Sequence, residues 1–237
     1  MAEAAERAGR NVADVTLVAV SKTHPLDVII DAYQAGLHHF GENRSDEFQD
    51  KRTGFSKWLA VQAQAEPVYW HFIGHVQSRQ AGLILDSQPA LIHSVDSLKL
   101  AQRLDRLARS QDAPPVNVLL QCNVSGESSK SGFALHQWAT DQRQLANFLN
   151  IIEQIAALEK ITIAGLMTMA PYSDAAEDSR PVFRRLAALR SKLRETASHL
   201  AWPHLSMGMT NDFEVGIEEG ATIIRVGRAI FGERNYN

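Results

Sequence analysis

Hydrophobic and polar residues follow each other along this chain in two alternating patterns. Short runs rich in Val, Ile and Leu each precede a longer stretch whose apolar residues recur at the spacing of a helix. The runs read apolar almost throughout, which is typical of parallel strands covered by helices on both faces. The predicted strands are residues 15–22, 38–43, 68–74, 90–96, 116–125, 161–170, 204–210 and 222–232.

The stretch 97–110 shows the clearest helical pattern. Its apolar residues fall on one stripe and its charged residues lie opposite. The stripe consists of Leu98, Leu100, Ala101, Leu104, Leu107 and Ala108. A second helix of this kind is predicted over 180–200. Ser97 and Pro181 stand near the two helix starts, where a capping hydroxyl and a residue without an N–H are favoured.

Eight β/α units in 237 residues match the size of a (β/α)₈ TIM barrel, a single α/β domain. An open, doubly wound sheet is the alternative, because a strand count does not show that the sheet closes. The chain has no proline- or serine-rich linker and no shift in composition. We therefore predict one domain over residues 1–237, with a lead-in helix within 1–14.

Composition narrows the function classes. The formal net charge is −3 and the Lys and Arg residues are scattered, which argues against nucleic acid or an anionic membrane surface as the main partner. No run approaches the ~20 apolar residues of a membrane span, and the first ten residues lack the apolar core of a secretory signal. The single cysteine, Cys122, lies in an apolar run and is expected to be buried. We expect a cytoplasmic monomer.

In a barrel of this type the chemistry lies at the carboxyl ends of the strands. The first predicted strand ends at Lys22. By spacing alone a solvated lysine is the more common reading, but a partly buried amine with a lowered pKa is the nucleophile that Schiff-base chemistry needs. Arg225 stands between Ile224 and Val226 in the last strand, which is costly unless its donors are satisfied. A structural ion pair and a functional cation remain equal alternatives for it.

The loops after the last two strands carry glycines and hydroxyl groups. Ser206, Gly208 and Thr210 come just before a predicted helix, and Gly227 follows the last strand. These loops often form a phosphate site in barrels, although tight turns prefer the same residues. The nine histidines show no HExxH motif or clustered metal spacing, and GxSxG is absent.

A lysine, a phosphate cradle and an arginine on one rim suggest pyridoxal 5′-phosphate (PLP). The sequence also resembles the pyridoxal phosphate homeostasis proteins, whose fold is similar to the barrel domain of alanine racemase, the fold type III of PLP proteins. The stretches that carry this resemblance cover nearly the whole chain in order: "VTLVAVSKTHP", "FGENRSDE", "WHFIGHVQSRQ", "IHSVDSLKLAQRL", "VLLQCNVSGESSKSGF", "IAGLMTMAP" and "LSMGMTNDFEVGIEEGATIIRVGRAIFG".

The resemblance implies a role for three residues around the cofactor ring. The family's cofactor lysine falls on Lys22, which would hold PLP as a Schiff base. Its arginine falls on Arg225, near the pyridine nitrogen, and Asn43 would approach the ring. Family members often have a second lysine where this chain has His24, and "QSNK" where it reads "QSRQ" at 77–80. The release of the cofactor is therefore left without an assigned residue.

For the phosphate, the resemblance implies contacts from Ser206 and Gly227. Thr210 and the backbone N–H of Arg228 are further phosphate contacts expected on the same grounds. No metal is implied.

Three functions follow as hypotheses. The first is a non-catalytic protein that binds PLP on Lys22, buffers it and passes it to apo PLP-dependent enzymes. The second is a minimal PLP-dependent amino-acid racemase with Tyr172 or His75 as its second base. The third is a barrel enzyme that acts on a phosphorylated sugar through Lys22 without a cofactor. A racemase of this fold takes its second base from an additional domain and a partner subunit, so the resemblance favours the carrier.

Overall fold

The computed structural model describes residues 1–63, 65–127 and 130–232. Within them, β1 pairs with both β2 and β9, and β4 pairs with β5, so that eight parallel strands close into a ring. The predicted barrel is confirmed and the open sheet is wrong. Its strands are β1 (Thr16–Val20), β2 (His39–Glu42), β3 (Tyr69–Phe72), β4 (Leu91–Val95), β5 (Val116–Asn123), β7 (Ile161–Met167), β8 (His204–Ser206) and β9 (Ile223–Val226).

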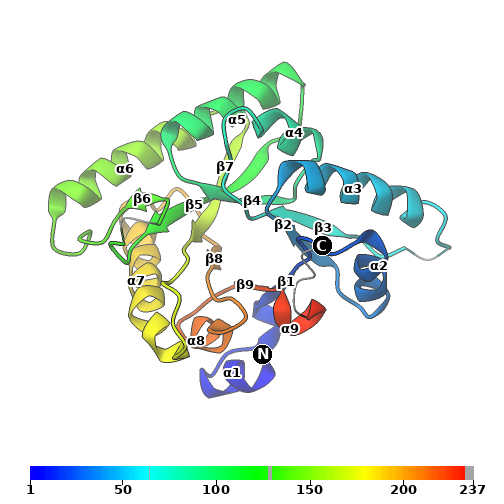
Figure 1. The fold of residues 1–237 in the computed structure, drawn as a ribbon. Coiled ribbons are helices and arrows are strands. Elements are labelled where there is room, and N and C mark those ends of the chain that lie inside the picture. Colours follow the sequence, from blue (N-terminus) through cyan, green and yellow to red (C-terminus); the bar gives the residue numbers. More distant parts are fainter. Residues whose placement is uncertain (64, 128–129, 233–237) are drawn as a thin grey trace.

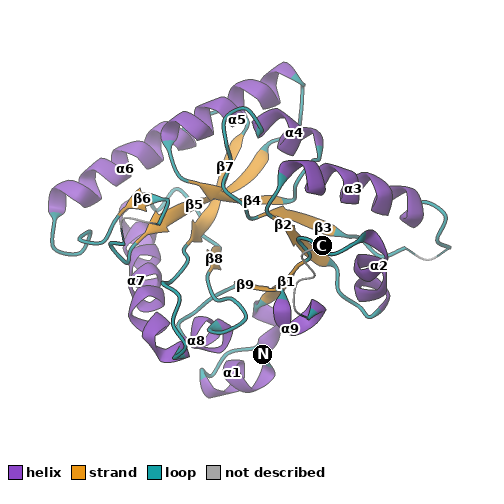
Figure 2. Cartoon of the chain, in the orientation of Figure 1, coloured by secondary structure: helices purple, strands orange, loops and turns teal. Residues whose placement is uncertain are grey.

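Helices surround this ring and connect successive strands (Figures 1 and 2). The predicted helix over 97–110 is confirmed, and the hydroxyl of Ser97 accepts from the N–H of Leu100. The helix predicted over 180–200 is also present and ends at Thr196. The helices are α1 (Ala2–Arg7), α2 (Leu26–Gln34), α3 (Ser45–Leu59), α4 (Ala81–Asp86), α5 (Leu98–Ser110), α6 (Gln142–Ala156), α7 (Arg180–Thr196), α8 (Phe213–Glu218) and α9 (Arg228–Phe231), with 3₁₀ turns at Val12–Asp14 and Ala176–Ser179.

The lead-in segment is a helix followed by a separate turn. Asn11 Oδ1 accepts from the N–H of Ala13 and thereby starts the 3₁₀ turn after α1. The guanidinium of Arg7 donates to Glu214 and Glu218 of α8, at 2.5 and 2.8 Å. These contacts attach α1 to the helix that connects the last two barrel strands.

Three predicted strands are too long at their carboxyl ends. The strands end at Met167, Ser206 and Val226, whereas the apolar runs continue for several residues. The residues after Met167 and Ser206 form loops at the rim, and those after Val226 turn at Gly227 into the short helix α9, which hydrophobicity alone does not distinguish from strand. A further two-residue strand, β6 (Phe133–Ala134), pairs with the end of β5 outside the ring.

The core has two layers. The larger lies between strands and helices, and the smaller fills the barrel with Val18, Leu91, Leu119, Met167 and Ile223. Cys122 is buried, as predicted, and its burial raises the pKa of the thiol. The interior of the barrel also holds polar side chains, which the apolar reading of the strands does not suggest.

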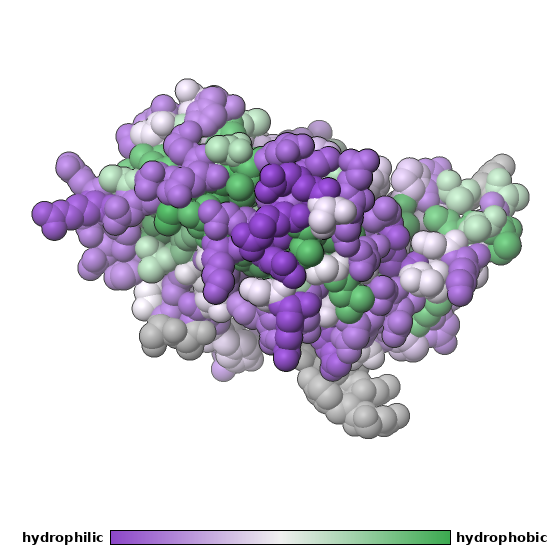
Figure 3. Space-filling view, turned by 90° about the horizontal axis from the view of Figure 1, so that it is seen from above, coloured by the Kyte–Doolittle hydropathy of each residue, from purple (hydrophilic) through white to green (hydrophobic). Residues whose placement is uncertain are grey.

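Seen from above relative to Figure 1, the surface is mainly hydrophilic, with hydrophobic residues in separate patches (Figure 3). In the part of the chain that the structure describes, each helix is too short or too polar to cross a membrane.

Candidate functional site

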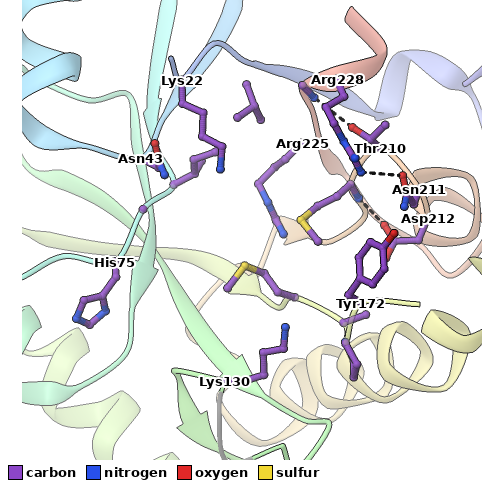
Figure 4. A pocket seen from close by; sticks show the side chains of 18 of the residues that line it. Lys22, Asn43, His75, Lys130, Tyr172, Thr210, Asn211, Asp212, Arg225 and Arg228 are labelled. Atoms are coloured by element: carbon purple, nitrogen blue, oxygen red, sulfur yellow. Dashed lines mark hydrogen bonds between the residues drawn. The ribbon is translucent and has the colours of Figure 1, made fainter. Parts of the chain in front are cut away.

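A cavity of about 400 Å³ lies at the carboxyl ends of the barrel strands. It collects residues from the loops that follow β1, β2, β3, β7, β8 and β9. Six of the seven residues predicted for the cofactor line it: Lys22, Asn43, Thr210, Arg225, Gly227 and Arg228. Figure 4 shows Lys22 and Asn43 on one side and Thr210 and Arg228 on the other, with Arg225 between them.

Lys51 of α3 holds the strand end that carries Lys22. The ammonium group of Lys51 donates to the carbonyl oxygen of Ser21 at 2.7 Å, to Glu42 Oε1 at 2.8 Å and to Glu47 Oε1 at 2.6 Å. The side chains of Lys51 and Glu42 are 8% and 0% exposed. We call Ser21, Glu42, Glu47 and Lys51 the strand-end network.

This network also holds the residues on both sides of Lys22. The hydroxyl of Ser21 donates to Glu42 Oε1 at 2.7 Å, and the N–H of Thr23 donates to Glu47 Oε1 at 2.5 Å. Thr23 has a φ of 68°, a conformation that a threonine adopts only when its surroundings hold it. The half-buried Lys22 is thus presented from an anchored backbone.

The carboxyl group of Glu42 is the buried centre of the network. Burial raises its pKa above the ordinary value, and the charge and hydrogen bond of Lys51 act in the opposite direction. Glu42 Oε2 is buried without a hydrogen-bond partner among the described residues. Lys51 is therefore the cation that makes this buried acid tolerable.

Arg225 lies under the cavity with its guanidinium almost fully buried. Its Nη1 donates to Ser206 Oγ at 2.5 Å and its Nη2 to the carbonyl oxygen of Thr168 at 3.0 Å. Burial lowers the pKa of Arg225 to about 10, and the charge of Asp212 acts in the opposite direction. The described ion pairs include none to Arg225, and its described side-chain hydrogen bonds go to neutral acceptors, which favours the functional cation over the ion-pair alternative. Neutral acceptors hold this cation.

Asn43 lines the cavity and carries a buried polar atom. Its Oδ1 is buried and has no hydrogen-bond partner within the described chain. Gly74 packs against the backbone of Asn43 so closely that a Cβ there would collide with its carbonyl group. The residue is thus fixed in place beside the cavity, and one of its polar atoms has no partner within the described chain.

The loops after β8 and β9 meet at the opposite wall of the cavity. The N–H of Gly227 donates to Thr210 Oγ1 at 3.4 Å, and Arg228 Nη2 donates to Asn211 Oδ1 at 3.3 Å (Figure 4). The two loops thus meet at this wall of the cavity, where a phosphate site stays a prediction.

One residue of the loop after β8 sets its shape. Gly208 has a φ of 94°, and a Cβ there would lie 2.9 Å from Cα of Phe213. The N–H of Met209 next to it donates to Asp212 Oδ1 at 2.6 Å. The loop therefore folds back tightly onto the start of α8.

Ser206 lies deeper than the sequence suggests. Its side chain is fully buried, and it is not among the described residues that line the cavity. Its hydroxyl oxygen accepts from Arg225 and lies 2.9 Å from His93 Nδ1. A direct phosphate contact from Ser206 stays a prediction, whereas its contact with Arg225 is what the geometry shows.

The candidate second bases lie at the rim. Tyr172 is 76% exposed, and its hydroxyl donates to Asp174 Oδ1 at 3.2 Å. The side chain of His75 is 57% exposed and lies 3.4 Å from Asp96 Oδ2. His24 lies beside the ring of Phe231 at a centroid distance of 5.1 Å. Both Tyr172 and His75 line the cavity, but neither is enclosed by it.

Several residues of the site could not be found by reading strand ends alone. Lys130 lines the cavity from the loop after β5. A lysine in a loop at the carboxyl end of a strand could have been noted as a candidate for the site, as Lys22 was. Glu47 and Lys51 are four residues apart on a helix, which usually indicates only a surface ion pair. Thr168 accepts from Arg225 through its backbone carbonyl, and because every residue has this group, the residue type gives no signal for the contact.

Comparisons with known proteins agree on one family. The model of the family "Alanine racemase, N-terminal domain" matches residues 1–235. The pyridoxal phosphate homeostasis protein of Aquifex aeolicus is 39% identical over 234 residues, which cover 99% of this chain and 93% of the relative. The protein of the same name in Escherichia coli K12 is 37% identical over 235 residues, covering 99% and 92%.

Solved structures give the same result. PipY of Synechococcus elongatus with PLP bound superimposes with a TM-score of 0.78 at 34% identity, covering 98% of this chain and 99% of that one. An alanine racemase of Clostridium difficile reaches a TM-score of 0.69 at 14% identity, and this chain covers 58% of it, which shows the shared fold. The chain therefore belongs to the alanine racemase N-terminal domain family and, within it, to the pyridoxal phosphate homeostasis proteins.

Proposed function

We propose that this protein binds PLP in the cavity at the carboxyl ends of the strands and holds it as a Schiff base on Lys22. The observation that carries the proposal is the convergence of Lys22, Arg225 and the loops after β8 and β9 on one cavity. Asn43, whose Oδ1 has no hydrogen-bond partner within the described chain, lines the same cavity and would meet a polar substituent of the ring after a small rotation of its side chain. The PLP found in PipY supports the same assignment. When bound, PLP supplies an aldehyde for the lysine and a pyridine ring that can withdraw electrons.

Each wall of the cavity has a separate task. The strand-end network would hold the turn that presents Lys22 to the cofactor's aldehyde, and Asn43 would approach the ring from the neighbouring strand end. Thr210, Gly227 and the backbone N–H of Arg228 would hold the phosphate on the opposite wall. Ser206 belongs to this site through Arg225, whose guanidinium it orients.

Arg225 limits the chemistry of the bound cofactor. A guanidinium beside the pyridine nitrogen disfavours protonation of that nitrogen, and an unprotonated ring is a weaker electron sink. Within the described residues, the hydrogen-bond partners of the Arg225 guanidinium are the neutral oxygens of Ser206 and Thr168, and no carboxylate is among them. The site is therefore suited to holding PLP rather than to stabilising a carbanion.

We infer that the protein buffers PLP and passes it to apo PLP-dependent enzymes. Tyr172 and His75, the two side chains considered as a racemase base, lie at the exposed rim and contact Asp174 and Asp96. Neither acid is among the described residues that line the cavity, so these contacts do not hold a base beside Lys22.

The lysine assignment is tested by reconstituting the protein with PLP and reducing it with borohydride. Wild-type protein should carry one stable adduct on the peptide that contains Lys22. Lys22→Ala should lose both this adduct and the Schiff-base absorption band. Lys130→Ala is the matched control, because it removes the other lysine of the cavity and should retain the adduct. An unchanged band in Lys22→Ala would refute the assignment.

Delivery is tested by mixing the loaded protein with an apo PLP enzyme in the presence of a phosphatase that destroys free PLP. Direct transfer should restore enzyme activity despite the phosphatase. Sustained exchange of the α-hydrogen of amino acids in deuterated water would instead favour the racemase.

A further inference from the structure

Three histidines form a continuous row of hydrogen bonds inside the barrel. They come from neighbouring strands: His39 from β2, His71 from β3 and His93 from β4. His39 Nδ1 lies 3.0 Å from His71 Nε2, and His71 Nδ1 lies 2.9 Å from His93 Nε2. The row begins at a cavity of about 380 Å³ that His39 and His71 line together with residues from the amino ends of the strands.

The other end of the row reaches the PLP cavity. His93 Nδ1 lies 2.9 Å from Ser206 Oγ, the same oxygen that accepts from Arg225. Five side chains thus connect the two ends of the barrel, and the last one lines the proposed cofactor site. We call His39, His71 and His93 the histidine row.

Filling the interior of a barrel with histidines costs more free energy than filling it with apolar side chains. His71 and His93 are 4% and 0% exposed, in a position where apolar side chains are the usual filling. Buried polar groups cost free energy unless all their partners are supplied, and local departures from the apolar pattern concentrate at functional sites. No set of three or more possible metal ligands is arranged for a metal among the residues that the structure describes. The row therefore calls for a different role.

Arg225 determines the direction of the hydrogen bonds. A guanidinium can only donate, so Ser206 Oγ accepts from it. His93 Nδ1 is the only acceptor that the described contacts offer to the hydroxyl hydrogen of this buried serine, so we direct that hydrogen to it. His93 then carries its hydrogen on Nε2 and donates to His71 Nδ1. His71 in turn donates from Nε2 to His39 Nδ1. A single tautomer, protonated at Nε2, satisfies every contact.

The row also stays uncharged. Burial, followed by the charge of His39 and of His204, lowers the pKa of His71 to about 3. Burial, followed by His71, Arg225 and His204, lowers the pKa of His93 well below its ordinary value. Neutral imidazoles whose unprotonated nitrogens point toward Arg225 stabilise that cation as dipoles. A carboxylate at this place would instead cancel the charge.

We propose that the histidine row positions the Ser206 hydroxyl against Arg225 and keeps the guanidinium fixed and uncancelled beneath the PLP cavity. His93 is the positioning residue that acts on Ser206, and His71 and His39 fix its tautomer. The proposal rests on the proposed function only where it places Arg225 against the pyridine nitrogen. The consequence for the cofactor is a ring nitrogen that remains unprotonated.

The row itself is tested without any cofactor. Nitrogen-15 NMR of the histidine rings in PLP-free protein should show His39, His71 and His93 as Nε2–H tautomers at neutral pH. Arg225→Met should allow His93 to change tautomer, because the group that forces the direction is gone. A His93 protonated at Nδ1 in the wild-type protein would overturn the proposal, whether or not the protein binds PLP.

The effect on the site is tested with three variants. His93→Phe keeps a ring but removes the acceptor, and PLP affinity should fall about tenfold or more because Ser206 no longer fixes Arg225. The pH dependence of the bound cofactor's absorption should change with it. His93→Asn places an amide oxygen near the Nδ1 position and should restore most of the affinity. His204→Asn is the control and should keep the wild-type affinity. His204 lines the cavity at the amino ends of the strands, as His39 and His71 do, but it is not a member of the histidine row.

The outcomes separate the two proposals. A folded His93→Phe protein with wild-type affinity and spectrum would overturn the positioning role. If His93→Phe does not fold, His71→Asn replaces it, with the tautomer of His93 as the readout. Failure of the wild-type protein to bind PLP would refute the proposed function, and the tautomer measurement would still decide the row.

Discussion

The ammonium group of Lys51 lies 2.7 Å from the carbonyl oxygen of Ser21, the residue directly before Lys22. One buried cation thus binds the backbone at the proposed Schiff-base position and the buried carboxyl group of Glu42. The carboxylate of Glu47 accepts hydrogen bonds from Lys51 and from the N–H of Thr23. The turn around Lys22 is therefore held to α3 at Ser21 and at Thr23. The position of the reactive amine therefore depends on a lysine that never enters the cavity.

Replacing this cation should destabilise the protein strongly. Lys51→Met leaves Glu42 buried without its partner, and removal of one member of a buried pair costs about 3–5 kcal/mol. Urea unfolding at neutral pH measures the change. Formation of the Schiff base on Lys22 should be slower in the same variant, because the turn loses its anchor.

The matched control for this prediction is Lys192→Met. Lys192 bonds Glu195 at 3.1 Å on the exposed face of α7, and its loss should change stability by no more than about 0.5 kcal/mol. A loss below about 1 kcal/mol in Lys51→Met would contradict the role given to the strand-end network.

The protein should become less stable as the pH falls from 7.5 to 5.5. The pKa of His71 is lowered from 6.5 to about 3 in the fold, so the unfolded chain binds a proton in this window and the native state does not. Protons therefore favour unfolding, and one such group removes about 1.4 kcal/mol between the two pH values. His93, whose pKa is shifted in the same direction, adds to this loss.

Urea denaturation at both pH values tests this dependence. His71→Asn should lower stability overall, but its difference between pH 7.5 and 5.5 should shrink by about 1 kcal/mol. Lys192→Met, which removes no histidine, should keep the wild-type difference. Equal pH differences in wild type and His71→Asn would contradict the neutral state of the row.

The loop after β8 should not tolerate a side chain at Gly208. Its φ of 94° and the short distance from a Cβ to Phe213 mean that Gly208→Ala must move the loop. We expect a loss of about 1–3 kcal/mol in stability and weaker PLP binding. Gly82→Ala in α4 is the control, because a Cβ there meets nothing within 4 Å and alanine favours the helix. Isothermal titration with PLP compares the two variants.

The barrel could be predicted because each strand and helix is indicated by the residues within that element. Each strand and helix carries its own period, and Ser97 even marks the first turn of α5. Lys22, Arg225 and Gly227 could be placed on one rim because parallel strands bring their carboxyl ends together. The strand ends at Met167, Ser206 and Val226 could not be predicted, since the loops after the first two and the short helix α9 after the third are as apolar as the strands.

The remainder of the site depends on contacts that the sequence does not encode locally. His71 and His93 are 22 residues apart and meet only because β3 and β4 are neighbours. The burial of Lys51 follows from the packing of α3 against the strand ends, whereas its spacing from Glu47 is that of an ordinary surface pair. Ser206 was assigned by motif to the phosphate, and only the direction of its side chain shows that it serves Arg225.

Asn43 separates binding from folding. Its Oδ1 makes no hydrogen bond within the described residues, so Asn43→Ala removes no contact of that oxygen from the protein itself. Its stability should therefore change by no more than about 0.5 kcal/mol, while PLP affinity falls about tenfold if this oxygen is used by the cofactor. Thermal unfolding without PLP and titration with PLP provide the two measurements. If affinity is unchanged in the folded variant, the oxygen is an unsatisfied structural atom and the ring of the cofactor lies elsewhere. If stability and affinity fall together, Asn43 acts through its packing against Gly74 instead of through the ligand.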